Sequence, residues 1–133
     1  MKILIAEDSR VDRVLLERIL SNAGYGVAAT KTCEEALEAY RNGGIDIALL
    51  DWMLPSIGGL SLIREIRAQD LRSGRYCIIV MVTSKAQKDD LVRALESGAD
   101  DFISKPIDEV LLVTKLKAII RLSRGMMAAK EVV

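Results

Sequence analysis

The sequence contains no histidine and only two cysteines, Cys33 and Cys77. Without an imidazole, the chain cannot form a Ser-His-Asp or Cys-His nucleophile, a histidine-ligated zinc site or a phosphohistidine of its own. The two cysteines lie far apart with no metal-ligand spacing, and they are too few for the disulfide framework of a small secreted domain. We therefore expect both cysteines to be small residues of a hydrophobic core.

Neither sign of charge is in excess, and no long apolar run is present. Lys plus Arg number 19 and Asp plus Glu number 19, so no overall field favours nucleic acid or an anionic membrane. The mostly apolar segment 1–6 stops at Glu7, which makes it too short for a signal-peptide core or a membrane span. We predict a cytoplasmic chain that binds neither nucleic acid nor membrane directly. Its 133 residues, 50% of them hydrophobic, suffice for one domain with a single core.

Short apolar runs rich in β-branched residues alternate with segments of helical period along most of the chain. This alternation predicts an α/β fold with a doubly wound parallel sheet, covered by helices on both faces. The predicted strands are residues 2–6, 25–30, 46–50, 77–82 and 100–103. Each is followed by a predicted helix, so the unit of one strand and one helix occurs five times.

The predicted helices have recognisable start and stop signals. Ser or Thr three residues before an acid or amide is typical of a helix start, and glycine is typical of the residue after a helix. The predicted ends are Ser9-x-x-Asp12 and Gly24, then Thr32-x-x-Glu35 and Gly43-Gly44, then Gly58-Gly59 and about Asp70, then Ser84-x-x-Gln87 and Gly98, with Asp108 starting the fifth helix. Charged residues on these helices, including Arg64, Glu65 and Arg67, are interpreted as solvent-exposed.

The strong pattern fades near residue 122, and no further strand follows. We predict one domain over residues 1–122, with residues 123–133 as an extension. Leu112, Leu116, Ile119 and Met126 fall near heptad spacing, so the extension is either a frayed helix end or a linker to an output domain outside this sequence. The sequence leaves both alternatives open.

Polar residues follow four of the predicted strands. Glu7 and Asp8 follow the first, Asp51 the third, Thr83 the fourth and Lys105 the fifth. The carboxyl ends of parallel strands meet at one edge, where ligands bind in such sheets. Three carboxylates on neighbouring strands repel one another unless a positive charge lies among them. With no histidine or cysteine beside them, their oxygens favour a hard cation, and a site with few protein ligands suits Mg²⁺ better than Ca²⁺.

The same residue types suit phosphoryl chemistry. A carboxylate such as Asp51 can act as the nucleophile that forms an aspartyl phosphate. Lys105 can neutralise charge on the transferred group, and the Thr83 hydroxyl can donate a hydrogen bond to one of its oxygens. Taken singly, each has an ordinary explanation, because Asp8 can cap a helix, Asp51 can start a turn and Lys105 can lie exposed before Pro106. We expect the Lys105-Pro106 peptide bond to be cis.

Four segments together carry a family resemblance: residues 3–9, 49–55, 82–84 and 98–106. Any one of them is a weak signal, but they occur in order and each lies at a predicted strand end. Over about residues 1–122, the chain resembles the response-regulator receiver domain, the CheY-like phospho-acceptor of two-component signalling. The resemblance implies a flavodoxin-like fold of five parallel strands in the order 2-1-3-4-5 with five helices.

The resemblance also assigns roles to the site residues. It makes Asp51 the phospho-acceptor and makes Mg²⁺ the metal. It implies the following set: Glu7, Asp8, Asp51 and the backbone carbonyl of Met53 as metal ligands, Thr83 and Lys105 as the other active-site side chains, and Thr83 and Phe102 as switch residues. Two positions depart from the frequent pattern. Phe102 lacks the hydroxyl of the usual tyrosine, and the bulky Met53 leaves the rate of dephosphorylation open.

The implied function is a signalling switch. A sensor histidine kinase or a histidine phosphotransfer protein would donate a phosphoryl group to Asp51. The surface of the fourth helix, fifth strand and fifth helix would then form a homodimer or contact a fused output domain. The chain itself would be an acceptor that assists its own phosphorylation and dephosphorylation, and not an enzyme in its own right.

Three alternatives compete with this function. A flavin or nucleotide domain needs a phosphate-binding loop after the first strand, where this chain has Glu7 and Asp8. A phosphatase needs a second acid close after Asp51, and Trp52 and Met53 supply none. A receiver-like interaction module that works without phosphorylation remains the alternative hypothesis.

Overall fold

The computed structural model describes residues 1–54, 58–84 and 88–132. Within them, parallel strands form one sheet in the order β2-β1-β3-β4-β5, which confirms the predicted fold class and strand order. The strands are β1 (Lys2–Ala6), β2 (Gly26–Thr30), β3 (Ile47–Leu50), β4 (Ile78–Thr83) and β5 (Asp101–Ser104). The helices are α1 (Arg10–Asn22), α2 (Cys33–Arg41), α3 (Gly58–Ser73), α4 (Lys88–Ser97) and α5 (Glu109–Val132).

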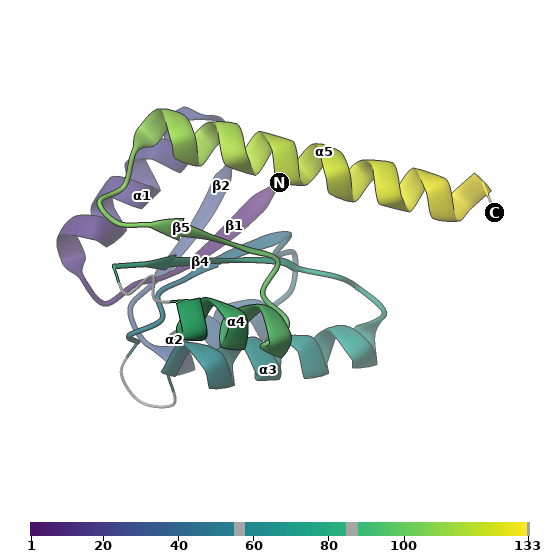
Figure 1. The fold of residues 1–133 in the computed structure, drawn as a ribbon, viewed down its shortest axis with the longest axis horizontal. Helices are drawn as coiled ribbons and strands as arrows, with labels where there is room; N and C mark the ends of the chain where they lie inside the picture. The colour runs from purple at the N-terminus through teal and green to yellow at the C-terminus, as the bar shows by residue number, and fades with distance from the viewer. Residues whose placement is uncertain (55–57, 85–87, 133) are drawn as a thin grey trace.

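The sheet separates two hydrophobic layers. Helices α1 and α5 cover one face, and α2, α3 and α4 cover the other (Figure 1). On β1, Ile3 and Ile5 pack into the layer under α1 and α5, whereas Leu4 and Ala6 pack into the opposite layer. Side chains of a strand point alternately to the two faces. A central strand therefore reads as a continuous apolar run, which is why β1, β3 and β4 are recognisable from the sequence.

Short polar side chains begin three helices where the sequence predicts them. The Ser9 hydroxyl accepts a hydrogen bond from the backbone N–H of Asp12 at 3.4 Å. The Thr32 hydroxyl accepts one from the N–H of Glu35 at 3.1 Å. The Asp108 carboxylate also caps the start of α5. Each cap pairs a backbone donor that has no partner within its helix.

One helix extends past its predicted end, and the predicted start of another is not tested. Helix α3 runs to Ser73, past the predicted end near Asp70, and stops where Gly74 takes the positive φ of +74° that is typical of the residue after a helix. The buried Asp70 carboxylate accepts a hydrogen bond from the N–H of Cys77 at 3.1 Å. Helix α4 is described from Lys88 onward, so the predicted Ser84-x-x-Gln87 cap lies partly outside the described residues.

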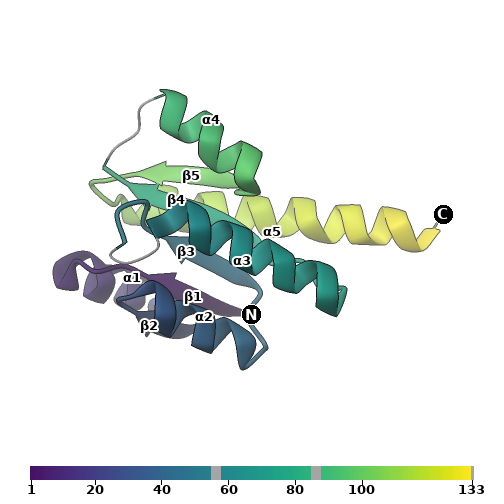
Figure 2. The same ribbon diagram turned by 90° about the horizontal axis from the view of Figure 1, so that it is seen from below.

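Helix α5 continues to Val132 and extends past the rest of the molecule (Figures 1 and 2). The predicted extension is therefore helical over its described part. Its role as a linker and the boundary at residue 122 remain predictions. Within the described residues, no helix combines the length and apolarity needed to cross a membrane.

Both cysteines are core residues, as predicted: Cys33 and Cys77 are 0% and 1% exposed. Burial raises the pKa of the Cys77 thiol to about 12. The cysteines pack in the same layer as Ala36 and Ile66. Such thiols behave as small apolar groups.

The prediction that Arg67 is a solvated surface charge is wrong. Its guanidinium donates to the backbone oxygen of Gly98 at 2.9 and 2.7 Å and to that of Cys77 at 2.6 Å. It also forms ion pairs with Asp70 at 2.8 Å and Asp100 at 2.9 Å. The five donors of a planar guanidinium can serve several acceptors at once. Arg67 therefore ties α3 to the start of β4 and to the segment between α4 and β5.

Candidate functional site

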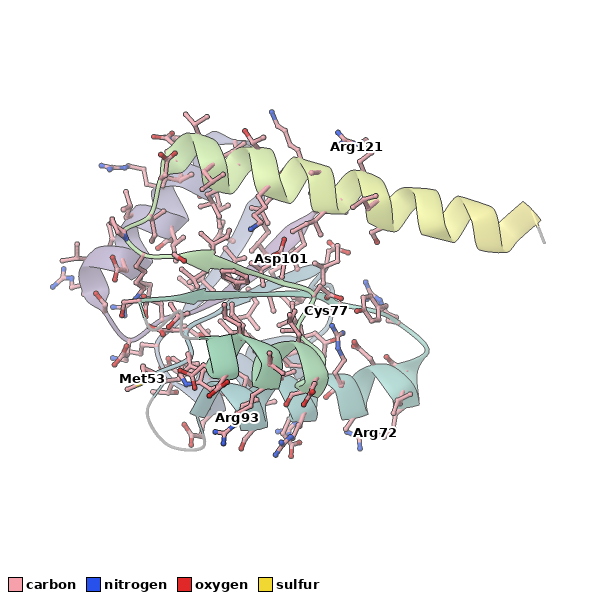
Figure 3. The ribbon with its side chains drawn as sticks, viewed as in Figure 1. Met53, Arg72, Cys77, Arg93, Asp101 and Arg121 are labelled. Carbon is pink, nitrogen blue, oxygen red and sulfur yellow. The ribbon has the colours of Figure 1, made fainter. Side chains whose placement is uncertain are left out.

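The predicted metal ligands and active-site side chains lie at the carboxyl end of the sheet, whereas Phe102 lies inside β5. Glu7 and Asp51 continue the strand ladders, because the N–H of Glu7 donates to Thr30 O at 3.0 Å and that of Asp51 to Ala6 O at 2.9 Å. The N–H of Lys105 donates to Thr83 O at 3.0 Å. These hydrogen bonds fix the backbone positions from which the three side chains extend. The Arg67 network lies at the opposite end, and Figure 3 shows Met53 and Cys77 at these two ends.

Three carboxylates form a compact cluster. Glu7, Asp8 and Asp51 each offer an oxygen, and these oxygens lie within 4.8 Å of one another. Asp8 is exposed, whereas Glu7 and Asp51 are 1% and 6% exposed. Burial, followed by the neighbouring Asp51 carboxyl, raises the pKa of Glu7 to about 8. Two buried carboxylates so close together do not both ionise easily without a nearby cation.

Asp51 is held in its ionised form. Burial alone would raise its pKa, but the neighbouring Glu7 carboxyl group and hydrogen bonds from the Met53 backbone and from Lys105 together lower the pKa below its ordinary value. The Met53 N–H donates to Asp51 Oδ1 at 3.0 Å, and the Lys105 ammonium donates to Asp51 Oδ2 at 3.1 Å. A carboxylate with these two donors is available as a nucleophile at neutral pH.

Lys105 is the cation of the cluster. Its ammonium contacts Glu7 Oε1, Asp12 Oδ2 at 3.0 Å and Asp51 Oδ2 at 3.1 Å. Burial alone would lower its pKa, but hydrogen bonds with these three carboxylates raise the pKa above its usual range. The Lys105-Pro106 peptide bond is cis, as predicted.

Two residues of α1 take part in ways that the sequence analysis missed. Asp12 contacts Lys105, although the sequence pattern assigned it only to a helix cap. Arg13 donates to the backbone oxygens of Glu7 at 2.9 Å and Asp8 at 3.4 Å. Asp12 lies in the first turn of α1, and α1 begins two residues after Asp8. The short distance in sequence from the acid pair to this turn was the available signal.

The residues present fit a divalent cation. Among the described side chains, Glu7 Oε2 is buried without a hydrogen-bond partner, and an oxygen in that state is costly unless something binds it. The cluster offers only oxygen ligands, the kind that Mg²⁺ prefers. Glu7, Asp8 and Asp51 could therefore hold such an ion. The Met53 side chain is 52% exposed, and its carbonyl as a metal ligand remains a prediction.

The two proposed switch residues lie near β4 and β5. Thr83 ends β4 and is buried, next to Ser104 in the register. Phe102 is partly buried against the layer under α2, α3 and α4. The Lys115 ammonium lies 5.2 Å from its ring centroid and donates to its backbone oxygen at 2.8 Å. Both residues occupy the predicted positions, and their switching role remains a prediction.

Gly59 sets how closely α3 approaches the site. A Cβ at this position would lie 2.9 Å from the backbone oxygen of Asp51 and 3.0 Å from the Cα of Trp52. We expect Gly59→Ala to lower the free energy of unfolding by about 1–3 kcal/mol, because the clash is with backbone that cannot rotate away. Urea denaturation measures the change. Gly125→Ala, where a Cβ meets open space in α5, is the control and should not destabilise the chain. Equal stability of wild type and Gly59→Ala would contradict this close approach.

Comparisons with known proteins agree with the fold and give the family. The family model described as "Response regulator receiver domain" matches residues 3–117. The transcriptional regulatory protein CseB of Streptomyces avermitilis is 37% identical over 119 residues, covering 90% of this chain and 48% of CseB. The phosphate regulon transcriptional regulatory protein PhoB of Escherichia coli K12 is 33% identical over 132 residues, covering 99% of this chain and 56% of PhoB.

A solved structure of a receiver domain has the same fold. A CheY-like response regulator receiver domain from Methanospirillum hungatei JF-1 matches with a TM-score of 0.83 and 31% identity, covering 94% of this chain and 97% of that one. This chain spans about half the length of the curated relatives CseB and PhoB. Because the family match runs from β1 into α5 and includes every predicted site residue, the chain belongs to the response regulator receiver domain family of two-component systems.

Proposed function

We propose that this receiver domain accepts a phosphoryl group on Asp51, with Mg²⁺ bound by the neighbouring acids. One observation carries the proposal. The ionised, buried Asp51 contacts the Lys105 ammonium and lies beside the carboxyl group of Glu7, whose Oε2 has no hydrogen-bond partner among the described residues. A nucleophile, a cation for the transferred group and a metal site are thus available at one sheet edge. Together, these three features favour phosphoryl transfer over a purely structural role for the cluster.

In the proposed reaction, a carboxylate oxygen of Asp51 forms a bond to phosphorus as the bond from phosphorus to the donor's histidine nitrogen breaks. Asp51 needs no general base, because its lowered pKa keeps it ionised. Lys105, 3.1 Å from Asp51 Oδ2, neutralises charge on the phosphoryl oxygens, and the Thr83 hydroxyl donates a hydrogen bond to one of them. Mg²⁺ supplies further neutralisation of that charge when it is bound.

The donor we propose, from the family to which the chain belongs, is a sensor histidine kinase or a histidine phosphotransfer protein. The phosphohistidine itself would lie outside these residues, since the sequence contains no histidine. This chain would assist its own phosphorylation and dephosphorylation without being an enzyme otherwise. We place the exchange in the cytoplasm, the compartment predicted from the sequence.

The proposed output is a change on the surface formed by α4, β5 and α5. Val92 and Leu95 of α4 are 43% and 47% exposed, which leaves apolar contact area for a second copy or for a fused output domain. The names of CseB and PhoB support an output in transcriptional regulation. An added phosphoryl group would place negative charge beside Thr83 and Lys105, and this charge would change which conformation of the surface is favoured.

The test is intact mass after incubation with a small-molecule phosphodonor, with and without Mg²⁺. We expect the wild type to gain one phosphoryl group in Mg²⁺ and none after Mg²⁺ is chelated. Asp8→Asn, which removes one exposed ligand charge, should gain it more slowly. If the wild type gains nothing while a known receiver domain is phosphorylated in parallel, the interaction module that works without phosphorylation becomes the better explanation.

A further inference from the structure

Asp12 is a fourth carboxylate at the site, and it comes from a helix. Its Oδ2 lies 3.0 Å from the Lys105 ammonium, in the first turn of α1. The N–H of Asp12 is held by the Ser9 hydroxyl, and the Lys105 backbone is held by Thr83 O. Both partners therefore start from fixed backbone positions, and their side chains meet across the site.

The three carboxylates around Lys105 differ in how much of each side chain is exposed to solvent. The Glu7 side chain is 2% exposed and that of Asp51 is 7% exposed, whereas that of Asp12 is 28% exposed. The Lys105 side chain itself is 15% exposed. An ammonium has three donors, so these three acceptors use all of them. Asp12 is the partner on the solvent side.

A divalent cation at the acid cluster would compete with Lys105. The ammonium already occupies Glu7 Oε1 and Asp51 Oδ2, and both carboxylates belong to the cluster that fits a metal ion. Two cations on the same carboxylates repel each other strongly in a buried site. Metal binding therefore favours an ammonium that has shifted outward, and a shifted ammonium without a partner would be costly.

We infer that Asp12 is a positioning residue for Lys105. It holds the Lys105 ammonium when Glu7 and Asp51 bind a divalent cation. The inference rests on the Mg²⁺ binding in the proposed function. Asp12 keeps the charge of Lys105 paired in both states, so the cation enters without leaving a lone ammonium. Because Asp12 Oδ2 and Asp51 Oδ2 lie 3.0 and 3.1 Å from the same ammonium, an ammonium held by Asp12 alone stays at the edge of the site where the proposed phosphoryl group would form.

A simpler explanation is that Asp12 only favours the start of α1, as acidic residues in a first turn do. This explanation predicts a small loss of stability in Asp12→Asn and no change in the binding of Mg²⁺. The positioning role predicts weaker Mg²⁺ binding in that variant. The two explanations therefore differ in the affinity for Mg²⁺, which a change in helix stability alone does not alter.

The experiment is a Mg²⁺ titration followed by the fluorescence of Trp52, the single tryptophan, which adjoins Asp51. We expect Asp12→Asn to bind Mg²⁺ about two- to fivefold more weakly, the range that an ion pair near the surface supports. Asp12→Glu should recover most of the affinity. Glu17→Gln removes the same charge from an exposed position on the same helix and should leave the affinity unchanged.

The same substitution in a Lys105→Met background separates positioning from a general field effect. If Asp12 acts through Lys105, Asp12→Asn should then weaken Mg²⁺ binding by a clearly smaller factor than in the wild-type background, because only the direct attraction between its charge and the cation remains. An undiminished effect in that background, or no effect in the single variant, would overturn the inference alone. Failure of the wild type to bind Mg²⁺ would contradict both this inference and the metal binding in the proposed function.

Discussion

Arg67→Ala is expected to lower the free energy of unfolding by about 3–5 kcal/mol, the loss typical of breaking a buried ion pair from one side. The Arg67 side chain is 17% exposed and that of its partner Asp70 only 6%. Its removal leaves a buried carboxylate without its cation, and it takes the donors from the backbone oxygens of Gly98 and Cys77. Unpaired buried groups of this kind carry the full cost of desolvation.

Urea denaturation followed by circular dichroism measures this loss. Arg64→Ala is the matched control, because Arg64 is exposed on the same helix, and it should change stability by no more than about 0.5 kcal/mol. Arg67→Lys should lie between the two, since an ammonium keeps the charge but loses the planar fork. A loss below about 1 kcal/mol in Arg67→Ala, on the scale of exposed ion pairs, would show that the network contributes little.

Much of the fold is predictable because buried parallel strands and capped helices leave local signals. The apolar run of β1 and the cap at Ser9 are both visible within a few residues of sequence. The candidate site follows from one geometric rule, that the carboxyl ends of parallel strands share an edge. By this rule Glu7, Asp51 and Lys105 are expected to meet, and the structure places them in contact.

Contacts that join distant segments are not predictable in the same way. Asp70, three residues after Arg67, is visible as a helical neighbour, but Gly98 and Asp100 lie more than 30 positions away. Nothing in the local sequence shows that they meet. Asp12 was missed for a different reason, because one residue serves as both a first-turn acid and a partner of Lys105. A single local explanation concealed the second role.

The roles of Phe102 and Thr83 concern a change between two conformations. A sequence pattern reflects the packing of a stable state, and the structure presents one arrangement of β4 and β5. Thr83 ends β4 and Phe102 lies in β5. Their switching role remains a prediction that phosphorylation itself must test.

Asp51→Asn is expected to abolish phosphoryl gain. The amide keeps the size of the carboxyl group, and its oxygen can still accept the hydrogen bond from the Met53 N–H, so the variant should fold. A neutral amide oxygen, however, lacks the charge that makes the carboxylate a nucleophile. The expected effect is a loss of reaction with the fold preserved, which circular dichroism verifies separately.

The most direct measurement is the intact mass of wild type, Asp51→Asn and Asp89→Asn after incubation with Mg²⁺ and a small-molecule phosphodonor. Asp89 is an exposed aspartate in the first turn of α4 and serves as the matched control. If Asp51 is the acceptor, the wild type and Asp89→Asn each gain one phosphoryl group and Asp51→Asn gains none. An equal gain in Asp51→Asn would place the acceptor elsewhere and contradict the central assignment.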